Sequence, residues 1–242
     1  MNVKAYFKIR KVNNVEANEL RKLCAKEAMN YIQNNSIIGL GAGRNIEFLI
    51  EYVSEEIKNG LKLKVVTPSY NTKKLCVEKG IEVLETYFVD EIDVAFDGCG
   101  EVDTNFYASK SGGGVHTKEK LIAAMAKDYI LLIDEGKFTD ALSCKYPVSL
   151  EVIKDSLSYV IKSVEKIGGV PTVRRNGIKD GYTITDDGNF LIDVQFDSVK
   201  DFKELNDYLN NIDGVIGTAL FTKEVTRIII AGKNGVRVVS KV

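Results

Sequence analysis

Clustered metal ligands are scarce in this chain. The 242 residues include a single histidine, His116, and four cysteines, none of them in a C-x-x-C pair. Zinc and iron–sulfur sites are built from such clusters, so the sequence predicts no metal site, and we expect no cofactor. The wide spacing of the cysteines fits reduced thiols in a cytoplasmic protein. These cysteines are Cys24, Cys76, Cys99 and Cys144.

An excess of charge and a long apolar run are also missing. The net charge is -1 at pH 7, so the overall balance gives no reason to expect nucleic acid or an anionic membrane as a partner. No run approaches the length of a membrane span and no signal-peptide core opens the chain, so we expect a cytoplasmic protein. The first segment alone is locally basic, and we expect a solvated extension there: Lys4, Lys8, Arg10 and Lys11.

Stretches with helical apolar spacing alternate with short apolar runs over the first part of the chain. The short runs are typical of buried strands and the periodic stretches of amphipathic helices. This alternation predicts an α/β fold, with a mostly parallel, Rossmann-like sheet and helices on both of its faces. The predicted strands are 36–40, 63–67, 81–84, 92–96 and 129–133, and the predicted helices are 15–34, 45–58, 72–79 and 117–127.

The pattern changes after about Pro147. Shorter helices and strands there indicate a small α+β unit of the split βαβ kind. We therefore expect a main domain of residues 1–147 plus 223–242 and a small domain of residues 148–222. The later predicted elements are helices 156–167 and 198–211, strands 172–174 and 216–221, a hairpin at Asp187-Gly188, and strands 227–231 and 236–239, which we place in the main domain.

A lysine, a glycine run and a glutamate lie together between Lys110 and Lys120. Glycines let a backbone approach a ligand closely, and the helix that begins near Thr117 adds the positive end of its dipole. Glu119, in the first turn, is suited to removing a proton beside a carbonyl while Lys110 stabilises the charge on oxygen. The alternative is an ordinary loop with a first-turn acid. Ligands of such sheets bind beyond the carboxyl ends of the strands, where we expect Gly41, Ser69, Asp97 and Asp134 to gather.

Six motifs in this order resemble ribose-5-phosphate isomerase of the A type. Three of them are loops: Gly41-Ala-Gly-Arg-Asn45, Asp97-Gly-Cys-Gly-Glu-Val-Asp103, and the segment from Lys110 to Lys120. The others are Ile133-Asp-Glu-Gly-Lys137, Tyr146-Pro-Val-Ser-Leu-Glu-Val152 and Gly168-Gly-Val-Pro-Thr-Val-Arg174. A single glycine motif is weak evidence, whereas six in order are strong.

The resemblance implies a main α/β domain with a smaller ferredoxin-like domain, a homo-oligomer (dimer or tetramer), and metal-free interconversion of ribose 5-phosphate and ribulose 5-phosphate through an enediolate. It implies Glu119 as the general base, Lys110 as the cation near the reacting oxygens, and Asp97 as a carboxylate that hydrogen-bonds the sugar. Further positions are expected to contact the sugar phosphate: Arg21, Gly41, Ala42, Gly43, Arg44, Asn45, Ser69, Gly98, Cys99, Gly100, Ser111, Gly112, Gly113 and Lys137.

The chain departs from the family pattern at several of these positions. The family commonly has G-T-G-S-T where this chain has Gly41-Ala-Gly-Arg-Asn45, so hydroxyl groups are missing, although the Arg44 guanidinium offers a fork to phosphate. Gly100 replaces the second aspartate of D-G-A-D, Arg21 replaces a lysine, and Ser111 interrupts K-G-G-G. We expect His116 to be a cap or surface group rather than a catalytic one.

One alternative to the isomerase follows from these departures, and two others are weaker. Gly100 and Ala42 motivate a relative that senses a sugar phosphate or isomerises a different one, with lost or redirected catalysis. A transferase or deaminase of the wider fold group is disfavoured by the ordered motifs. Dinucleotide binding is weaker still, because Gly39-x-Gly41-x-Gly43 lacks the six-residue fingerprint.

Overall fold

The computed structural model describes residues 14–177 and 180–241. The basic N-terminal segment lies outside the described residues. None of the helices in the part of the chain that is described has the length and apolar character needed to cross a bilayer.

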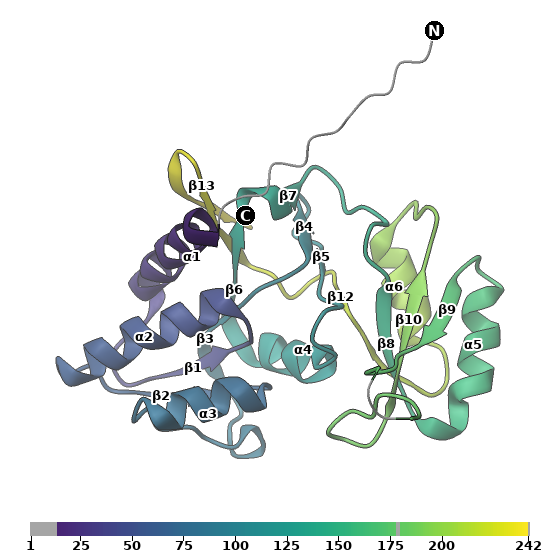
Figure 1. The fold of residues 1–242 in the computed structure, drawn as a ribbon, viewed down its shortest axis with the longest axis horizontal. Helices are drawn as coiled ribbons and strands as arrows, with labels where there is room; N and C mark the ends of the chain where they lie inside the picture. The colour runs from purple at the N-terminus through teal and green to yellow at the C-terminus, as the bar shows by residue number, and fades with distance from the viewer. Residues whose placement is uncertain (1–13, 178–179, 242) are drawn as a thin grey trace, which may run out of the picture.

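A six-stranded sheet forms the centre of the molecule (Figure 1). Its strand order is β14-β13-β6-β3-β1-β2, and all neighbours are parallel except β13 and β14. The mostly parallel sheet is therefore confirmed, and the last two strands join it as predicted. The strands are β1 (Ser36–Leu40), β2 (Leu63–Val66), β3 (Ile92–Asp97), β6 (Ala126–Asp134), β13 (Arg227–Gly232) and β14 (Gly235–Ser240).

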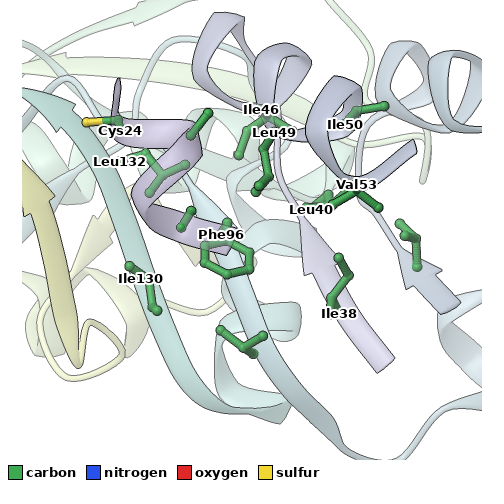
Figure 2. Close-up of a cluster of buried hydrophobic side chains, with 14 of the residues drawn as sticks. Cys24, Ile38, Leu40, Ile46, Leu49, Ile50, Val53, Phe96, Ile130 and Leu132 are labelled. Atoms are coloured by element: carbon green, nitrogen blue, oxygen red, sulfur yellow. The ribbon is translucent and has the colours of Figure 1, made fainter. Parts of the chain in front are cut away.

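Helices cover both faces of this sheet. On one face α1 (Asn14–Ala28), α2 (Arg44–Lys58) and α3 (Tyr70–Glu78) contribute to an apolar core with the strands. Figure 2 shows the α2 side chains Ile46, Leu49 and Ile50 above this sheet. On the other face α4 (His116–Met125) supplies Ile122 and Ala123 to a second apolar core. Apolar packing on both faces explains the nearly continuous apolar sequence of the strands.

A separate four-stranded antiparallel sheet, with its two helices, lies at the opposite end of the molecule from α1–α3 (Figure 1). Its order β11-β8-β10-β9, with one helix between β8 and β9 and another between β10 and β11, is the ferredoxin-like βαββαβ arrangement. The elements are β8 (Val148–Val152), α5 (Leu157–Glu165), β9 (Val170–Val173), β10 (Phe190–Gln195), α6 (Phe202–Asn210) and β11 (Val215–Thr218).

A third sheet of short strands was not predicted. It has the order β12-β5-β4-β7 and consists of β4 (Glu101–Asp103), β5 (Ala108–Ser109), β7 (Phe138–Thr139) and β12 (Leu220–Phe221). Strands of two or three residues are too short to produce a recognisable period, so apolar periodicity does not predict them. Two of its strands, β4 and β5, lie between Asp97 and the glycine loop, so pairing with β7 and β12 fixes the chain there.

The predicted strand over 216–221 is wrong. β11 ends at Thr218 in the antiparallel sheet, and β12 begins at Leu220 in the third sheet. Ala219 joins the two: its N–H donates to the Ser149 carbonyl, and its own carbonyl accepts from the Lys110 N–H at 2.9 Å. A continuous apolar run therefore serves two sheets, and its period does not reveal the crossing.

Other element ends also differ from the predictions. The helix predicted over 15–34 is α-helical only to Ala28 and ends in a 3₁₀ turn over Met29–Tyr31, after which Ile32 is extended. The helix predicted to 127 ends at Met125 because Ala126 pairs with Ile92 in the sheet. The helix predicted from 198 begins at Phe202, after its cap Asp201. The strand predicted over 81–84 is a single bridge at Val83.

Candidate active site

A cavity of about 470 Å³ opens where β1 and β3 end, between the glycine loop and α2. Its volume suits a small ligand, and carboxyl ends of parallel strands are the usual binding edge of such sheets. The lining residues are Arg21, Ala42, Gly43, Arg44, Asn45, Asp97, Gly98, Cys99, Gly100, Ser109, Lys110, Ser111, Gly112, Gly113, Glu119, Lys137 and Tyr146.

Lys110 lies between two carboxylates at the buried end of this cavity. Its Nζ is 2.9 Å from Asp97 Oδ2 and 3.5 Å from Glu119 Oε2. All three residues are less than a tenth exposed. Lys110 follows β5, Asp97 ends β3 and Glu119 stands in the first turn of α4, so three separate elements bring the groups together.

Asp97 is held by the backbone and by a phenol. Its carboxylate accepts hydrogen bonds from the Gly98 N–H at 2.7 Å and from the Tyr129 hydroxyl at 3.1 Å. Gly41 packs against it so closely that an added Cβ would lie 2.0 Å from the Asp97 carboxyl carbon. Glycine at position 41 is thus required for the approach of the β1 loop to this carboxylate.

Glu119 has an unusual acidity for a carboxylic acid. Burial, together with the charge of Asp97, raises its pKa to about 8, although Lys110 acts in the opposite direction. A carboxyl group with a pKa close to neutral pH is well suited to take up and return a proton. The same pattern of burial and a specific charge partner is typical of functional sites.

Lys110 keeps its charge despite its burial. Burial alone would lower its pKa, but the nearby Asp97 and Glu119 carboxylates outweigh this effect and hold the pKa above its usual range. The ammonium group also donates to the Gly98 carbonyl. A fixed, desolvated cation therefore remains beside the acid, where negative charge on a ligand oxygen would be stabilised.

The opposite wall of the cavity is formed by the N-terminus of α2 and by cations. Gly43 caps this 15-residue helix with no side-chain hydrogen bond, which leaves the positive end of its dipole to a ligand. Arg21, Arg44 and Lys137 also line the cavity. Arg44 is mainly exposed and pairs with Glu47 at 2.8 Å, while Asn45 donates to the Leu132 carbonyl at 2.6 Å. This wall is suited to a phosphate group.

Most of the residues predicted from the sequence line this cavity, but Gly41 and Ser69 do not. Gly41 contacts Asp97 from behind, and Ser69 caps α3 by accepting from the Thr72 N–H. Sequence reasoning missed Ser109 and Tyr146. Tyr146 lies opposite Gly100, where an added Cβ would be 3.6 Å from its ring. It begins one of the six motifs, but that motif was not connected with the cavity.

His116 is not the surface group that was predicted. It is fully buried under β11, with Nε2 3.3 Å from the Gly217 carbonyl. Burial lowers its pKa to about 4, so the ring is neutral at pH 7. It does not line the cavity. Across residues 14–177 and 180–241, no group of three or more histidine, cysteine, aspartate or glutamate side chains is placed to bind a metal ion.

The sequence is similar to those of known ribose-5-phosphate isomerases of the A type. The family model of ribose 5-phosphate isomerase A (phosphoriboisomerase A) matches residues 64–235. The ribose-5-phosphate isomerase A of Pyrococcus horikoshii is 37% identical over 226 residues, 93% of this chain and 98% of that protein. That of a Synechococcus species is 35% identical over 216 residues, 88% of this chain and 93% of that protein.

Solved structures of the same description have the same fold. Ribose 5-phosphate isomerase A from Methanocaldococcus jannaschii superposes with a TM-score of 0.86 at 33% identity, covering 92% of this chain and 99% of that one. A D-ribose-5-phosphate isomerase in complex with phospho-erythronic acid gives a TM-score of 0.87 at 35% identity, covering 92% and 98%. The chain belongs to the ribose 5-phosphate isomerase A family.

Proposed function

We propose that this protein interconverts ribose 5-phosphate and ribulose 5-phosphate, with Glu119 as the general base. The observation that carries the proposal is the buried cluster in which the Lys110 ammonium lies between the Glu119 and Asp97 carboxylates. Membership of the family and the complex of a relative with phospho-erythronic acid, a phosphorylated sugar acid, support the same substrate class.

The chemistry is a proton transfer between two neighbouring carbons. In the open-chain aldose, the Glu119 carboxylate removes the proton from C2, and the electron pair forms the C1–C2 double bond while the carbonyl electrons move to O1. The resulting enediolate carries negative charge on oxygen, which the Lys110 ammonium stabilises. Return of the proton from Glu119 to C1, with movement of the hydroxyl proton from O2 to O1, yields the ketose. Atoms and charge balance without any added group.

The remaining cavity residues orient the substrate. The Asp97 carboxylate accepts a hydrogen bond from a sugar hydroxyl. The phosphate binds at the N-terminus of α2, with Arg21, Arg44 and Lys137 around it. The other predicted contacts are backbone groups and small side chains along the three loops: Ala42, Gly43, Asn45, Gly98, Cys99, Gly100, Ser111, Gly112 and Gly113. Gly41 and Ser69 support the site from behind rather than by contact.

The proposed oligomeric state and cellular compartment follow from the family and from the cysteines. A homo-oligomer, dimer or tetramer, working in the cytoplasm in pentose phosphate metabolism fits the family and the free state of the described cysteines.

For the small domain, the antiparallel sheet from Val148 to Thr218 supports a boundary close to Thr218 rather than at 222, because β12 pairs with β5.

A direct assay tests the proposal. Purified protein in a metal chelator should convert ribose 5-phosphate to ribulose 5-phosphate, and ribose 5-phosphate should stabilise it against heat more than other phosphorylated sugars do. If ribose 5-phosphate stabilised the protein but was not converted, the protein would instead be a sugar-phosphate sensor. Turnover of a different phosphosugar in preference would instead identify an isomerase of other specificity.

A further inference from the structure

Arg174, beside the antiparallel sheet, makes two hydrogen bonds to the glycine loop, and Ser149 on β8 makes one, to the Ser111 carbonyl at 3.3 Å. Arg174 follows β9, and its guanidinium donates to the Ser111 carbonyl at 2.7 Å and to the Gly112 carbonyl at 3.3 Å. Ser111 and Gly112 line the cavity, whereas Arg174 does not. Arg174 therefore binds the loop from the side that faces away from the cavity.

The two contacts of Arg174 fix the direction of the loop amides. In a trans peptide the carbonyl of one residue and the N–H of the next point in opposite directions. With the carbonyls of Ser111 and Gly112 turned to Arg174, the N–H groups of Gly112 and Gly113 are turned away from it. Within residues 14–177 and 180–241 neither N–H donates a hydrogen bond. Successive amides that point the same way form a nest for an anionic oxygen.

Arg174 is itself held in place. Asp193 accepts from its Nε at 2.8 Å and from its Nη2 at 2.6 Å, a bidentate pair, and Ser149 accepts from Nη2 at 2.7 Å. The side chains of Arg174 and Asp193 are 19% and 23% exposed, so the pair is largely shielded from solvent. Such a fork has fixed geometry as well as charge.

The loop is also packed against the guanidinium. Gly114 has a φ of +72°, and a Cβ there would lie 3.0 Å from Arg174 Nη1 and 2.7 Å from a Leu191 methyl group. The loop follows the antiparallel sheet this closely because Gly114 has no side chain. The position of the glycine loop is therefore set by its contacts with the antiparallel sheet as well as by its own sequence.

We infer that Arg174 is a positioning residue: held by Asp193 and Ser149, it fixes the glycine loop so that the amides of Gly112 and Gly113 face the oxygens of the bound sugar phosphate. The inference rests on the proposed function for the identity of the ligand. It assigns to the antiparallel sheet a part in substrate binding, although none of its strands lines the cavity.

Chemical rescue tests this role. Arg174→Ala should lower kcat/KM for ribose 5-phosphate by about 100-fold, the cost of a small misplacement of binding groups. Millimolar guanidinium or methylguanidinium should restore a large part of this loss. Arg174→Lys, which keeps the charge without the fork, should not match wild type. Arg175→Ala is the matched control, because Arg175 stacks on Tyr182 instead of contacting the loop, and its activity should be unchanged.

Several outcomes would overturn the inference. Wild-type kcat/KM in Arg174→Ala or full activity in Arg174→Lys would do so, as would a loss that guanidinium does not restore in folded protein. If Arg174→Ala does not fold, Arg174→Lys decides the matter by the same kinetics.

A binding measurement separates this inference from the proposed function. Calorimetry with phospho-erythronic acid requires no turnover, and Arg174→Ala should weaken its binding at least about tenfold. Absence of turnover in the wild type together with this weakening would contradict the isomerase and support the role of Arg174. Turnover in the wild type with equal binding by both proteins would support the isomerase and contradict the role of Arg174.

Discussion

The two larger sheets of this protein differ in what covers their faces. The parallel sheet is packed between two apolar clusters, one on each side. The antiparallel sheet has apolar residues on one face, such as Leu150, while alternate residues on β8, Ser149 and Glu151, are buried and polar. That second face meets the glycine loop and the start of α4. The parallel sheet therefore supplies stability and the strand ends, and the antiparallel sheet supplies polar support for the loop.

Two buried or half-buried carboxylates on the polar face of the antiparallel sheet are engaged in hydrogen bonds. Glu151 accepts from Thr185 and Asn189, and Asp193 from Arg174. Burial acts to raise the pKa of Asp193, but the hydrogen bonds of Arg174 and Ser149 prevail and lower it. Satisfied networks of this kind rigidify their surroundings.

Replacing the proposed base should have the largest effect. Glu119→Gln removes proton transfer and keeps the shape of the site, so kcat for ribose 5-phosphate should fall by about 10²–10⁴-fold while calorimetry finds phospho-erythronic acid still bound. Glu204→Gln, another first-turn glutamate, on α6, should leave kcat unchanged and serves as the control. Undiminished kcat in Glu119→Gln would remove Glu119 as the base.

Truncation in the parallel sheet should affect stability instead of chemistry. Ile38 is fully buried in the core on the α1–α3 face. Ile38→Ala should lower the free energy of unfolding by about 2–5 kcal/mol through lost burial and a cavity, measured by urea denaturation. The folded variant should retain its kcat/KM. A large loss of kcat/KM with normal stability would contradict the claim that this part of the parallel sheet serves stability and not the site.

Weakening the polar face of the antiparallel sheet should lower activity as well as stability. Asp193→Asn keeps the size of the side chain but removes the charge that holds Arg174. We expect kcat/KM to fall about tenfold, and the free energy of unfolding to fall by about 1–3 kcal/mol, as for a hydrogen bond to a charged group. Steady-state kinetics together with urea denaturation separates the two effects. An unchanged kcat/KM would contradict the claim that the polar face of the antiparallel sheet supports the glycine loop.

The acidity of Glu119 predicts a smaller effect, on the pH dependence of stability. Its pKa is about 8 in the fold and 4.5 ordinarily, so the unfolded chain binds fewer protons between these values. Its contribution is present below pH 4.5 and is lost as pH rises toward 8. Glu119→Gln should therefore unfold at a higher temperature than wild type at pH 9, with a difference that shrinks toward pH 5. A constant difference would contradict the raised pKa.

The sequence predicts more of the buried cluster of Lys110, Asp97 and Glu119 than of the groups that support it. Lys110 and Glu119 lie near each other along the chain, and Asp97 follows an apolar run that reads as a strand, so local patterns were sufficient. Arg174 contacts Ser111 across a large separation in sequence, and only the packing of the antiparallel sheet brings them together. The crossing at Ala219 and the burial of His116 likewise depend on how two sheets meet, which apolar periodicity does not encode.

A structure of the complex with phospho-erythronic acid would show whether Glu119 and Lys110 contact the reacting end of the sugar. The acid group of the ligand should lie within about 3 Å of Glu119 or Lys110, as expected for groups that exchange protons and charge. Its phosphate should lie at the N-terminus of α2, near Arg44 and Lys137. A phosphate bound at Glu119, or a ligand bound outside this cavity, would contradict the account.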